Sequence, residues 1–121
     1  MNERLSLAQI ALLITYAGGM AGGQVLFKLA AMRLPDGSAV ERAVSLIGNG
    51  FFIAAILLYA ALAVLWVWVL TFTPLSRAYP FVALAFAVTP LLGVFIFSEP
   101  LSSRLIIGIA VVFCGLLLIA G

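Results

Sequence analysis

Residues 51–72 read FFIAAILLYAALAVLWVWVLTF and contain no charged side chain. A helix needs about 20 apolar residues to cross a hydrocarbon core roughly 30 Å thick, so this stretch is long enough to span a membrane. It belongs to the second of four apolar runs that short polar connections separate. The runs cover approximately residues 5–27, 43–72, 78–98 and 102–120. Because open sheet edges cannot face lipid, the sequence predicts four membrane-spanning helices rather than strands.

The composition of the whole chain agrees with this prediction. Of the 121 residues, 66% are apolar and 8% are charged, and the mean hydropathy is +1.33. Soluble globular chains are roughly 45–50% apolar and about 25% charged, so the composition is typical of a polytopic membrane protein. Because the four runs occupy most of the chain, we expect one all-α transmembrane domain over residues 1–121 and no extramembrane domain.

The residue types exclude several classes of function. Histidine is absent, and the single cysteine, Cys114, is predicted to be a small buried packing residue in the fourth run. This excludes His-based acid–base catalysis, His/Cys zinc sites and internal disulfides. No phosphate loop or nucleophile–base pair is visible, so we expect no enzymatic activity, metal or cofactor. The 6 basic and 4 acidic residues are too few and too scattered for a nucleic-acid interface.

The short connections predict that successive helices run antiparallel and that both termini lie on one side of the membrane. In the first connection, Ser38 and Glu41 match a capping box that starts the second helix before the bilayer. Orientation follows from the basic residues, with Arg4 and Arg77 on the side of the termini and Lys28, Arg33, Arg42 and Arg104 on the other side. The count favours the first and third connections in the cytoplasm. Leaving out Lys28, near the membrane boundary, reduces the excess to three against two.

A polar stripe lies near the end of the first run. Gln24 and Lys28 are four residues apart, so they share one helix face. Polar groups at membrane depth normally face a bundle interior or a wet cavity, which makes these residues the leading site candidates, and the Lys28 ammonium suits a phosphate. Two alternatives need no ligand: a lysine that extends to the lipid headgroups, and a glutamine that bonds another helix.

Three further residues are candidates for the same chemistry. Glu99, in the third connection, is predicted to pair with Lys28 or Arg104 when the site is empty, or with a substrate amine when it is full. A structural ion pair or a helix cap is the alternative for Glu99. Arg104, in the first turn of the fourth run, is a candidate for binding phosphate. Trp66 is an interfacial anchor or a cavity wall, and Pro90 is expected to kink the third helix.

Four glycines in the first run form two overlapping small-xxx-small patterns: Gly18, Gly19, Gly22 and Gly23. Such patterns let a second helix approach closely, so helix packing is the first interpretation. A cavity wall shaped for a substrate is the alternative, and the two uses are compatible.

Three motifs, in order along the chain, resemble a known family. Residues 66–80, WVWVLTFTPLSRAYP, resemble the W-x-x-V-L-x-x-x-P-L-S-x-A-Y-P signature of four-helix drug/metabolite transporters. Residues 98–104, SEPLSSR, followed by Gly108 and Gly115, are similar to the ending of that family. Residues 23–28 match its G-Q-x-x-x-K element. In particular, the chain resembles the subunits of the undecaprenyl-phosphate-aminoarabinose flippase.

This resemblance implies a bacterial inner-membrane protein that moves an undecaprenyl-phosphate-linked sugar from the cytoplasmic to the periplasmic leaflet, for modification of lipid A or another envelope glycan. The polyprenyl tail would remain in lipid. Four helices barely enclose a cavity, so we expect a homodimer, or a heterodimer with a similar four-helix subunit. Ala85, where the family often has Asn, and Pro90 depart from the pattern, so the sugar is not assigned. The candidate substrate-binding residues are Lys28, Gln24, Glu99, Arg104, Tyr79 and Trp66.

Two other functions stay open. A proton-coupled small multidrug or metabolite exporter needs a membrane-embedded acid, whereas Gln24 cannot titrate and Lys28 would repel a cationic drug. That function would require Glu99 to lie deeper than the length of its connection indicates. The other is an accessory membrane subunit of a glycosyltransferase, which would use the glycines of the first run to bind its partner.

Overall fold

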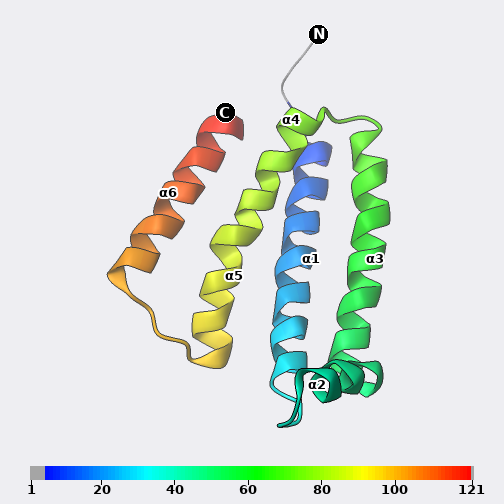
Figure 1. Cartoon of the computed structure of the whole chain (residues 1–121). Helices are drawn as coiled ribbons and strands as arrows, with labels where there is room; N and C mark the ends of the chain where they lie inside the picture. The colour runs from blue at the N-terminus through cyan, green and yellow to red at the C-terminus, as the bar shows by residue number, and fades with distance from the viewer. Residues whose placement is uncertain (1–4, 121) are drawn as a thin grey trace.

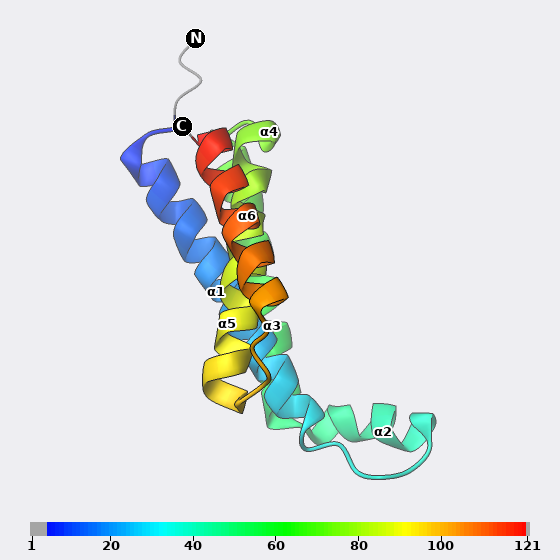
Figure 2. The same ribbon diagram turned by 90° about the vertical axis from the view of Figure 1, so that its left-hand side faces the viewer.

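The computed structural model describes residues 5–120, and its four long helices lie side by side in one layer. α1 packs against α3 on one side and α5 on the other, and α6 packs against the far side of α5. Figure 1 shows the order α6, α5, α1, α3 across the layer, and the same helices overlap in the view turned by 90° (Figure 2). The bounds are α1 Leu7–Ala31, α3 Gly50–Leu70, α5 Val82–Phe97 and α6 Ser103–Ala120.

These helices make the chain a four-helix membrane protein. Three segments are long and apolar enough to cross a membrane: Leu7–Ala31, Gly50–Leu70 and Leu75–Phe97. α6 is a shorter apolar helix, and at about 1.5 Å per residue its 18 residues extend nearly through the hydrocarbon core. The described residues contain no strand. The all-α fold class is therefore confirmed.

The direction of the helices brings distant segments together. Successive long helices run antiparallel, so α1 and α5, which are neighbours in the layer, run the same way (Figure 1). The start of α1 and the end of α6 lie at the same end of the layer as α4, Leu75–Ala78. Arg77 lies in α4 at this end, whereas Arg4, counted with it above for orientation, lies outside the described residues.

The second apolar run is divided into three elements, where the sequence predicted one helix that starts at the Ser38 cap and continues over the apolar run of residues 43–72. α2, Ala39–Ser45, and the short 3₁₀ helix η1, Leu46–Gly48, precede α3. Asn49 has extended backbone angles, its side chain accepts from the Phe52 N–H, and its amide donates to the Ala30 carbonyl at 2.9 Å. Asn49 therefore starts α3 and ties it to the end of α1. Figure 2 shows α2 lying across the axis of the long helices.

The cap of α2 forms only half of the predicted capping box. Ser38 Oγ accepts from the Glu41 N–H at 3.1 Å, which is the first of its two bonds. Both bonds are present instead at the start of α1, between Ser6 and Gln9. At α6, Ser102 Oγ accepts from the Leu105 N–H at 3.1 Å.

The third apolar run also begins with shorter elements. α4 and the 3₁₀ helix η2, Tyr79–Phe81, precede α5, with Pro80 in the first turn of η2, where its missing N–H costs no hydrogen bond. The first and fourth runs, predicted at residues 5–27 and 102–120, are helical over Leu7–Ala31 and Ser103–Ala120. The first helix therefore continues one turn beyond Phe27 and includes Lys28.

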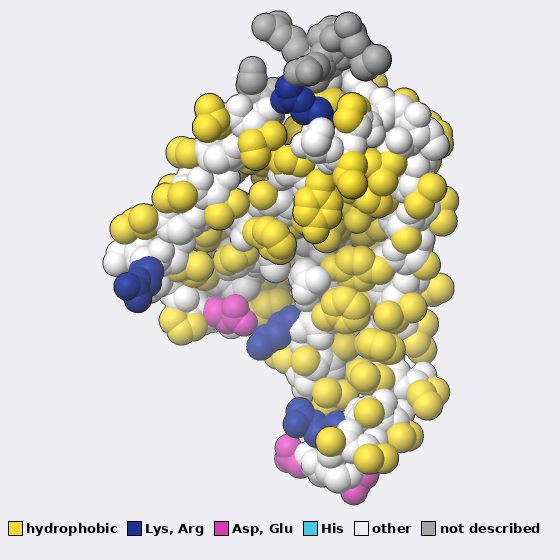
Figure 3. Space-filling model, turned by 45° about the horizontal axis from the view of Figure 1, so that its top comes forward, with side chains coloured by type: hydrophobic (Ala, Val, Ile, Leu, Met, Phe, Trp, Pro, Cys, Tyr) yellow, Lys and Arg dark blue, Asp and Glu magenta, His cyan; other side chains and the backbone are white. Residues whose placement is uncertain are grey.

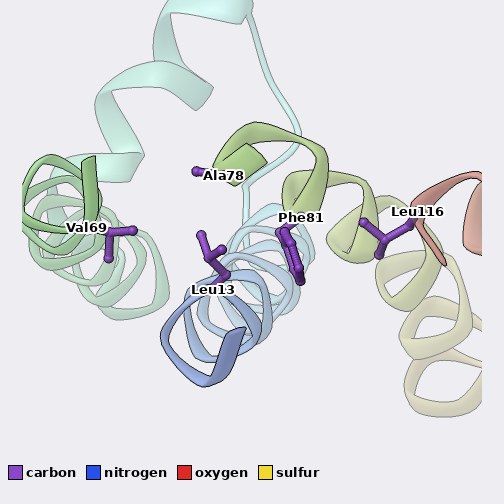
Figure 4. Packing of buried hydrophobic residues seen from close by; sticks show 5 residues of the cluster. All are labelled: Leu13, Val69, Ala78, Phe81 and Leu116. Atoms are coloured by element: carbon purple, nitrogen blue, oxygen red, sulfur yellow. The ribbon is translucent and has the colours of Figure 1, made fainter. Parts of the chain in front are cut away.

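The buried core is small and lies toward the α4 end. Leu13, Val69, Ala78, Phe81 and Leu116 form it, and Figure 4 shows their side chains between α1, α3, α4, η2 and α6. On the face in Figure 3, hydrophobic side chains are spread over the surface, and the few charged groups lie at the top, at the left edge, near the middle and at the bottom of the view. A single layer leaves much of each helix uncovered, so these side chains are available to lipid or to another chain.

Cys114 corrects one prediction. Its side chain was expected to be buried, but it is exposed on α6. The sequence shows that the fourth run is apolar, and an edge helix of a membrane protein is apolar on its outer side as well. Hydrophobicity alone therefore does not distinguish the two positions.

Candidate functional site

Three of the predicted site residues line one hollow between α1 and α5. Gln24 and Lys28 come from the last turns of α1, and Glu99 follows the end of α5. The hollow, here called the Lys28 pocket, has a volume of about 210 Å³. Its lining residues are Gln24, Val25, Lys28, Thr89, Pro90, Gly93, Phe97 and Glu99.

Lys28 and Glu99 form an ion pair in this pocket. Lys28 Nζ lies 3.6 Å from Glu99 Oε2, and the two side chains are 49% and 44% exposed. Ion pairs as exposed as this one typically contribute at most about 1 kcal/mol to stability. The pair is therefore accessible to a charged ligand and weak enough for a ligand to separate.

The end of α5 is built so that Glu99 turns back toward Lys28. Ser98 adopts a left-handed conformation with φ 54°, which ends the helix, and the Glu99 N–H then donates to the Gly93 carbonyl at 3.4 Å. A Cβ atom at Gly93 would collide with Glu99 Oε1. Gly93 therefore leaves the space that the carboxylate occupies beside α5.

Gln24 bonds in the other direction, toward α3. Its Nε2 donates to the Tyr59 hydroxyl at 2.8 Å, and that hydroxyl donates to the Met20 carbonyl at 2.8 Å. The Tyr59 ring stacks on Phe27 with centroids 5.3 Å apart. The interhelical hydrogen bond considered for Gln24 is thus present. The sequence analysis missed Tyr59, although a phenol inside an apolar span needs a hydrogen-bond partner and was a usable signal.

The glycines of α1 have two different environments. A Cβ at Gly19 would lie 2.8 Å from Leu62 Cδ2, and one at Gly23 would lie 2.5 Å from Tyr59 Cε2. These two glycines allow α3 to approach, as the packing interpretation predicted. A Cβ at Gly18 or Gly22 would meet nothing within 4 Å.

Arg104 lies in a separate groove between α5 and α6. This groove has a volume of about 470 Å³, and Pro90 lines both it and the Lys28 pocket. Within the described chain Arg104 forms no ion pair, and Glu99 pairs with Lys28, the other of its two predicted partners. The groove lining consists of Phe86, Pro90, Ser102, Arg104, Leu105, Gly108, Ile109 and Val112.

Trp66 and Tyr79 lie toward the opposite end of the layer. Trp66 stacks on Tyr16 with ring centroids 4.8 Å apart, and Tyr79 meets the Trp66 ring edge-on at 6.3 Å. Tyr79 is 60% exposed. The six predicted residues therefore occupy three places: the Lys28 pocket, the Arg104 groove and this aromatic cluster. Over residues 5–120, no three His, Cys, Asp or Glu side chains gather as metal ligands.

Curated proteins of one kind match the chain. A probable 4-amino-4-deoxy-L-arabinose-phosphoundecaprenol flippase subunit ArnE from Serratia proteamaculans is 36% identical over 99 residues, which are 82% of this chain and 84% of that protein. The protein of the same description from Enterobacter sp. strain 638 is 32% identical over 72 residues, 60% of this chain and 67% of that protein. No protein-family model matches the chain. No solved structure matches it either.

Proposed function

The chain belongs to the family of 4-amino-4-deoxy-L-arabinose-phosphoundecaprenol flippase subunits, and on this premise we propose that it transports an undecaprenyl-phosphate-linked aminosugar. It is a multi-pass protein of the bacterial inner membrane. The proposed direction is from the cytoplasmic to the periplasmic leaflet. Its role is movement of the lipid rather than catalysis of a reaction.

The Lys28–Glu99 ion pair is the observation that carries this proposal. A phosphate-linked aminosugar has one anionic group and one amino group that is cationic at neutral pH. Lys28 is suited to the phosphate and Glu99 to the ammonium group. When the substrate enters, each protein charge exchanges its partner for a substrate charge, so neither is left without a counter-charge at the membrane boundary.

The neighbouring candidates extend this site in two directions. The Gln24 amide lies one helical turn before Lys28 and supplies hydrogen bonds for sugar hydroxyls. Arg104, across Pro90, supplies a second cation for the phosphate. Trp66 and Tyr79 provide aromatic faces for the sugar toward the other end of the layer. The polyprenyl chain stays in lipid, since removing it would cost about 0.8 kcal/mol per CH₂ group.

The site is completed by a second subunit in this proposal. The Lys28 pocket, at about 210 Å³, is smaller than the roughly 300–1,000 Å³ of typical ligand pockets. The pocket lies in a single layer of helices, in which each long helix is covered only by its neighbours in the layer. A second four-helix subunit, either another copy or a similar chain, would face this layer and enclose the headgroup.

A proton-coupled exporter of cations is less well supported. Such an exporter needs an acid within the membrane. Glu99 follows the end of α5 and is paired with a lysine, and α1, α3, α5 and α6 contain no Asp or Glu.

Removal of the Lys28 charge tests the proposal. Lys28→Ala should lower transport at least about tenfold, because one charge-assisted hydrogen bond contributes about 1.5–3 kcal/mol. The measurement is the fraction of lipid-linked aminosugar that a membrane-impermeant amine reagent modifies on the periplasmic face. Arg42→Ala removes the same charge from α2, outside all three candidate places, and should transport normally.

A second substitution separates the two charges. Glu99→Gln should weaken binding of the aminosugar lipid and leave binding of undecaprenyl phosphate, which has no amine, unchanged.

If Lys28→Ala transports as well as the unaltered protein while assembly is intact, Lys28 serves only to reach the headgroups and the proposed site is wrong.

A further inference from the structure

A second and larger hollow lies where α2 and η1 meet the ends of α1 and α3. Its volume is about 620 Å³, and it is distinct from the Lys28 pocket, with which it shares no lining residue. Gly48 and Gly50 line it, and a Cβ atom at either would meet nothing within 4 Å. The absence of side chains at these two positions keeps the hollow open. We call it the Arg33 hollow.

The lining changes from apolar to polar along the direction of the long helices. Leu26 lies inside α1, whereas Arg33 lies two residues beyond its end at Ala31. On the other wall, Ala54 lies in the second turn of α3, whereas Ser45 ends α2 outside it. The inner part is therefore apolar and the outer part polar, which is the order of groups in a phospholipid.

Arg33 is held at this site without an acidic partner. Its guanidinium carbon lies 4.9 Å from the centroid of the Phe51 ring, a cation–π contact that positions the side chain on the wall of the hollow. Within residues 5–120 no carboxylate pairs with Arg33, in contrast to Lys28. A guanidinium presents parallel N–H donors that match the oxygens of a phosphate.

The position of α2 indicates what surrounds this hollow. Figure 2 shows α2 pointing outward, across the axis of helices that span the membrane, so it lies along the membrane surface. Val40 and Val44 of α2 are four residues apart and are 71% and 59% exposed, and Ile47 of the adjoining η1 follows three residues later and is 78% exposed. An apolar stripe on a helix in this orientation is typical of a segment that lies among lipid headgroups.

We propose that the Arg33 hollow binds one anionic phospholipid, with its phosphate on Arg33 and its glycerol and first acyl carbons against Leu26 and Ala54. The occupant is a phospholipid rather than a free phosphate, because the inner half of the hollow offers only apolar contacts to a ligand. This assignment does not depend on the transported substrate.

Native mass spectrometry of the whole protein tests the proposal, with phosphatidylglycerol and phosphatidylcholine as probes at equal concentration. The unaltered protein should retain phosphatidylglycerol in preference to phosphatidylcholine. Arg33→Gln should retain about tenfold less phosphatidylglycerol, and Arg33→Lys should recover part of the loss. Gly48→Leu fills the hollow without changing the charge, and it should also lose the lipid.

Two control variants should both retain the lipid, and each tests a different alternative. Arg42→Gln removes the same charge from neighbouring α2 without touching the hollow and should retain phosphatidylglycerol normally. Lys28→Gln should also retain it, which separates this site from the proposed transport site. Equal losses in Arg33→Gln and Arg42→Gln, equal retention of the two lipids, or displacement of phosphatidylglycerol by inorganic phosphate at equal concentration would overturn the proposal.

Discussion

Helices α1 and α6 both carry glycines on a helical repeat, but those glycines meet different surroundings. Gly19 and Gly23 of α1 lie against Leu62 and Tyr59 of α3, at distances that leave no room for a side chain. On α6, a Cβ at Gly108 or Gly115 would meet nothing within 4 Å. Gly18 and Gly22 of α1 also meet nothing within 4 Å. Glycine therefore allows close packing where α1 faces α3, and it leaves open space at the other glycines of α1 and α6.

The difference extends to the large side chains of the two helices. Leu13 on α1 is fully buried, whereas Leu118 on α6 is 83% exposed. α1 has a helix on each side, and α6 has α5 on one side only. Position in the layer, rather than hydrophobicity, decides which leucines stabilise the subunit. The outer side of α6 is left for lipid or for a second subunit.

The strongest test of this contrast compares equal truncations on the two helices. Leu13→Ala should lower the free energy of unfolding by about 2–5 kcal/mol, because it leaves a cavity among buried side chains. Leu118→Ala removes the same atoms from an exposed position and should change it by about 0.5 kcal/mol or less. Unfolding by SDS in mixed micelles, followed by circular dichroism, measures both. Equal effects would mean that the layer is not the folded unit.

A pair of adjacent glycines gives a smaller and more local test. Gly23→Ala should destabilise the subunit by about 1–3 kcal/mol, because the new methyl group collides with the Tyr59 ring at the α1–α3 contact. Gly22→Ala places a methyl group where no atom lies within 4 Å, and the better helix propensity of alanine should leave stability unchanged or raised. The same SDS titration measures both variants. A Gly22→Ala variant that loses subunit association but keeps its stability would assign the open glycine face to a partner.

The sequence was sufficient for the number, type and order of the long helices. A run of about 20 apolar residues forms a helix in lipid, because only a helix satisfies its backbone hydrogen bonds within the segment. The predicted runs at residues 5–27 and 102–120 therefore agree with α1 and α6 to within a few positions. The pairing of Lys28 with Glu99 was also among the predicted alternatives, because short connections place both residues at one end of the layer.

The sequence did not predict which helices lie side by side in the layer. Apolar side chains look alike whether they face lipid or another helix, so nothing in the fourth run distinguished exposed Cys114 from buried Leu116. By contrast, the break at Asn49 had a usable signal, because Gly48, Asn49 and Gly50 are three successive turn-forming residues inside the apolar run. Five of the six candidate residues were chosen by their chemistry and Tyr79 by the family motif that residues 66–80 resemble, but their separation into three places depends on the order of helices in the layer.

The smallest expected effect concerns the hydroxyl of Tyr59, the residue that the sequence analysis missed. Tyr59→Phe keeps the ring that packs on Phe27 and removes the hydrogen bonds to Gln24 and to the Met20 carbonyl. Hydrogen bonds between helices in a membrane average about 0.6 kcal/mol each, so stability should fall by about 1 kcal/mol. Tyr79→Phe is the control, because the Tyr79 hydroxyl has no hydrogen bond within the described residues, and it should leave stability unchanged.

A Tyr59→Phe variant as stable as the unaltered protein would mean that ring packing and the close approach at Gly23 hold α1 to α3 without help from Gln24. Gln24 would then be free to turn toward Lys28, which would strengthen its assignment to the transport site.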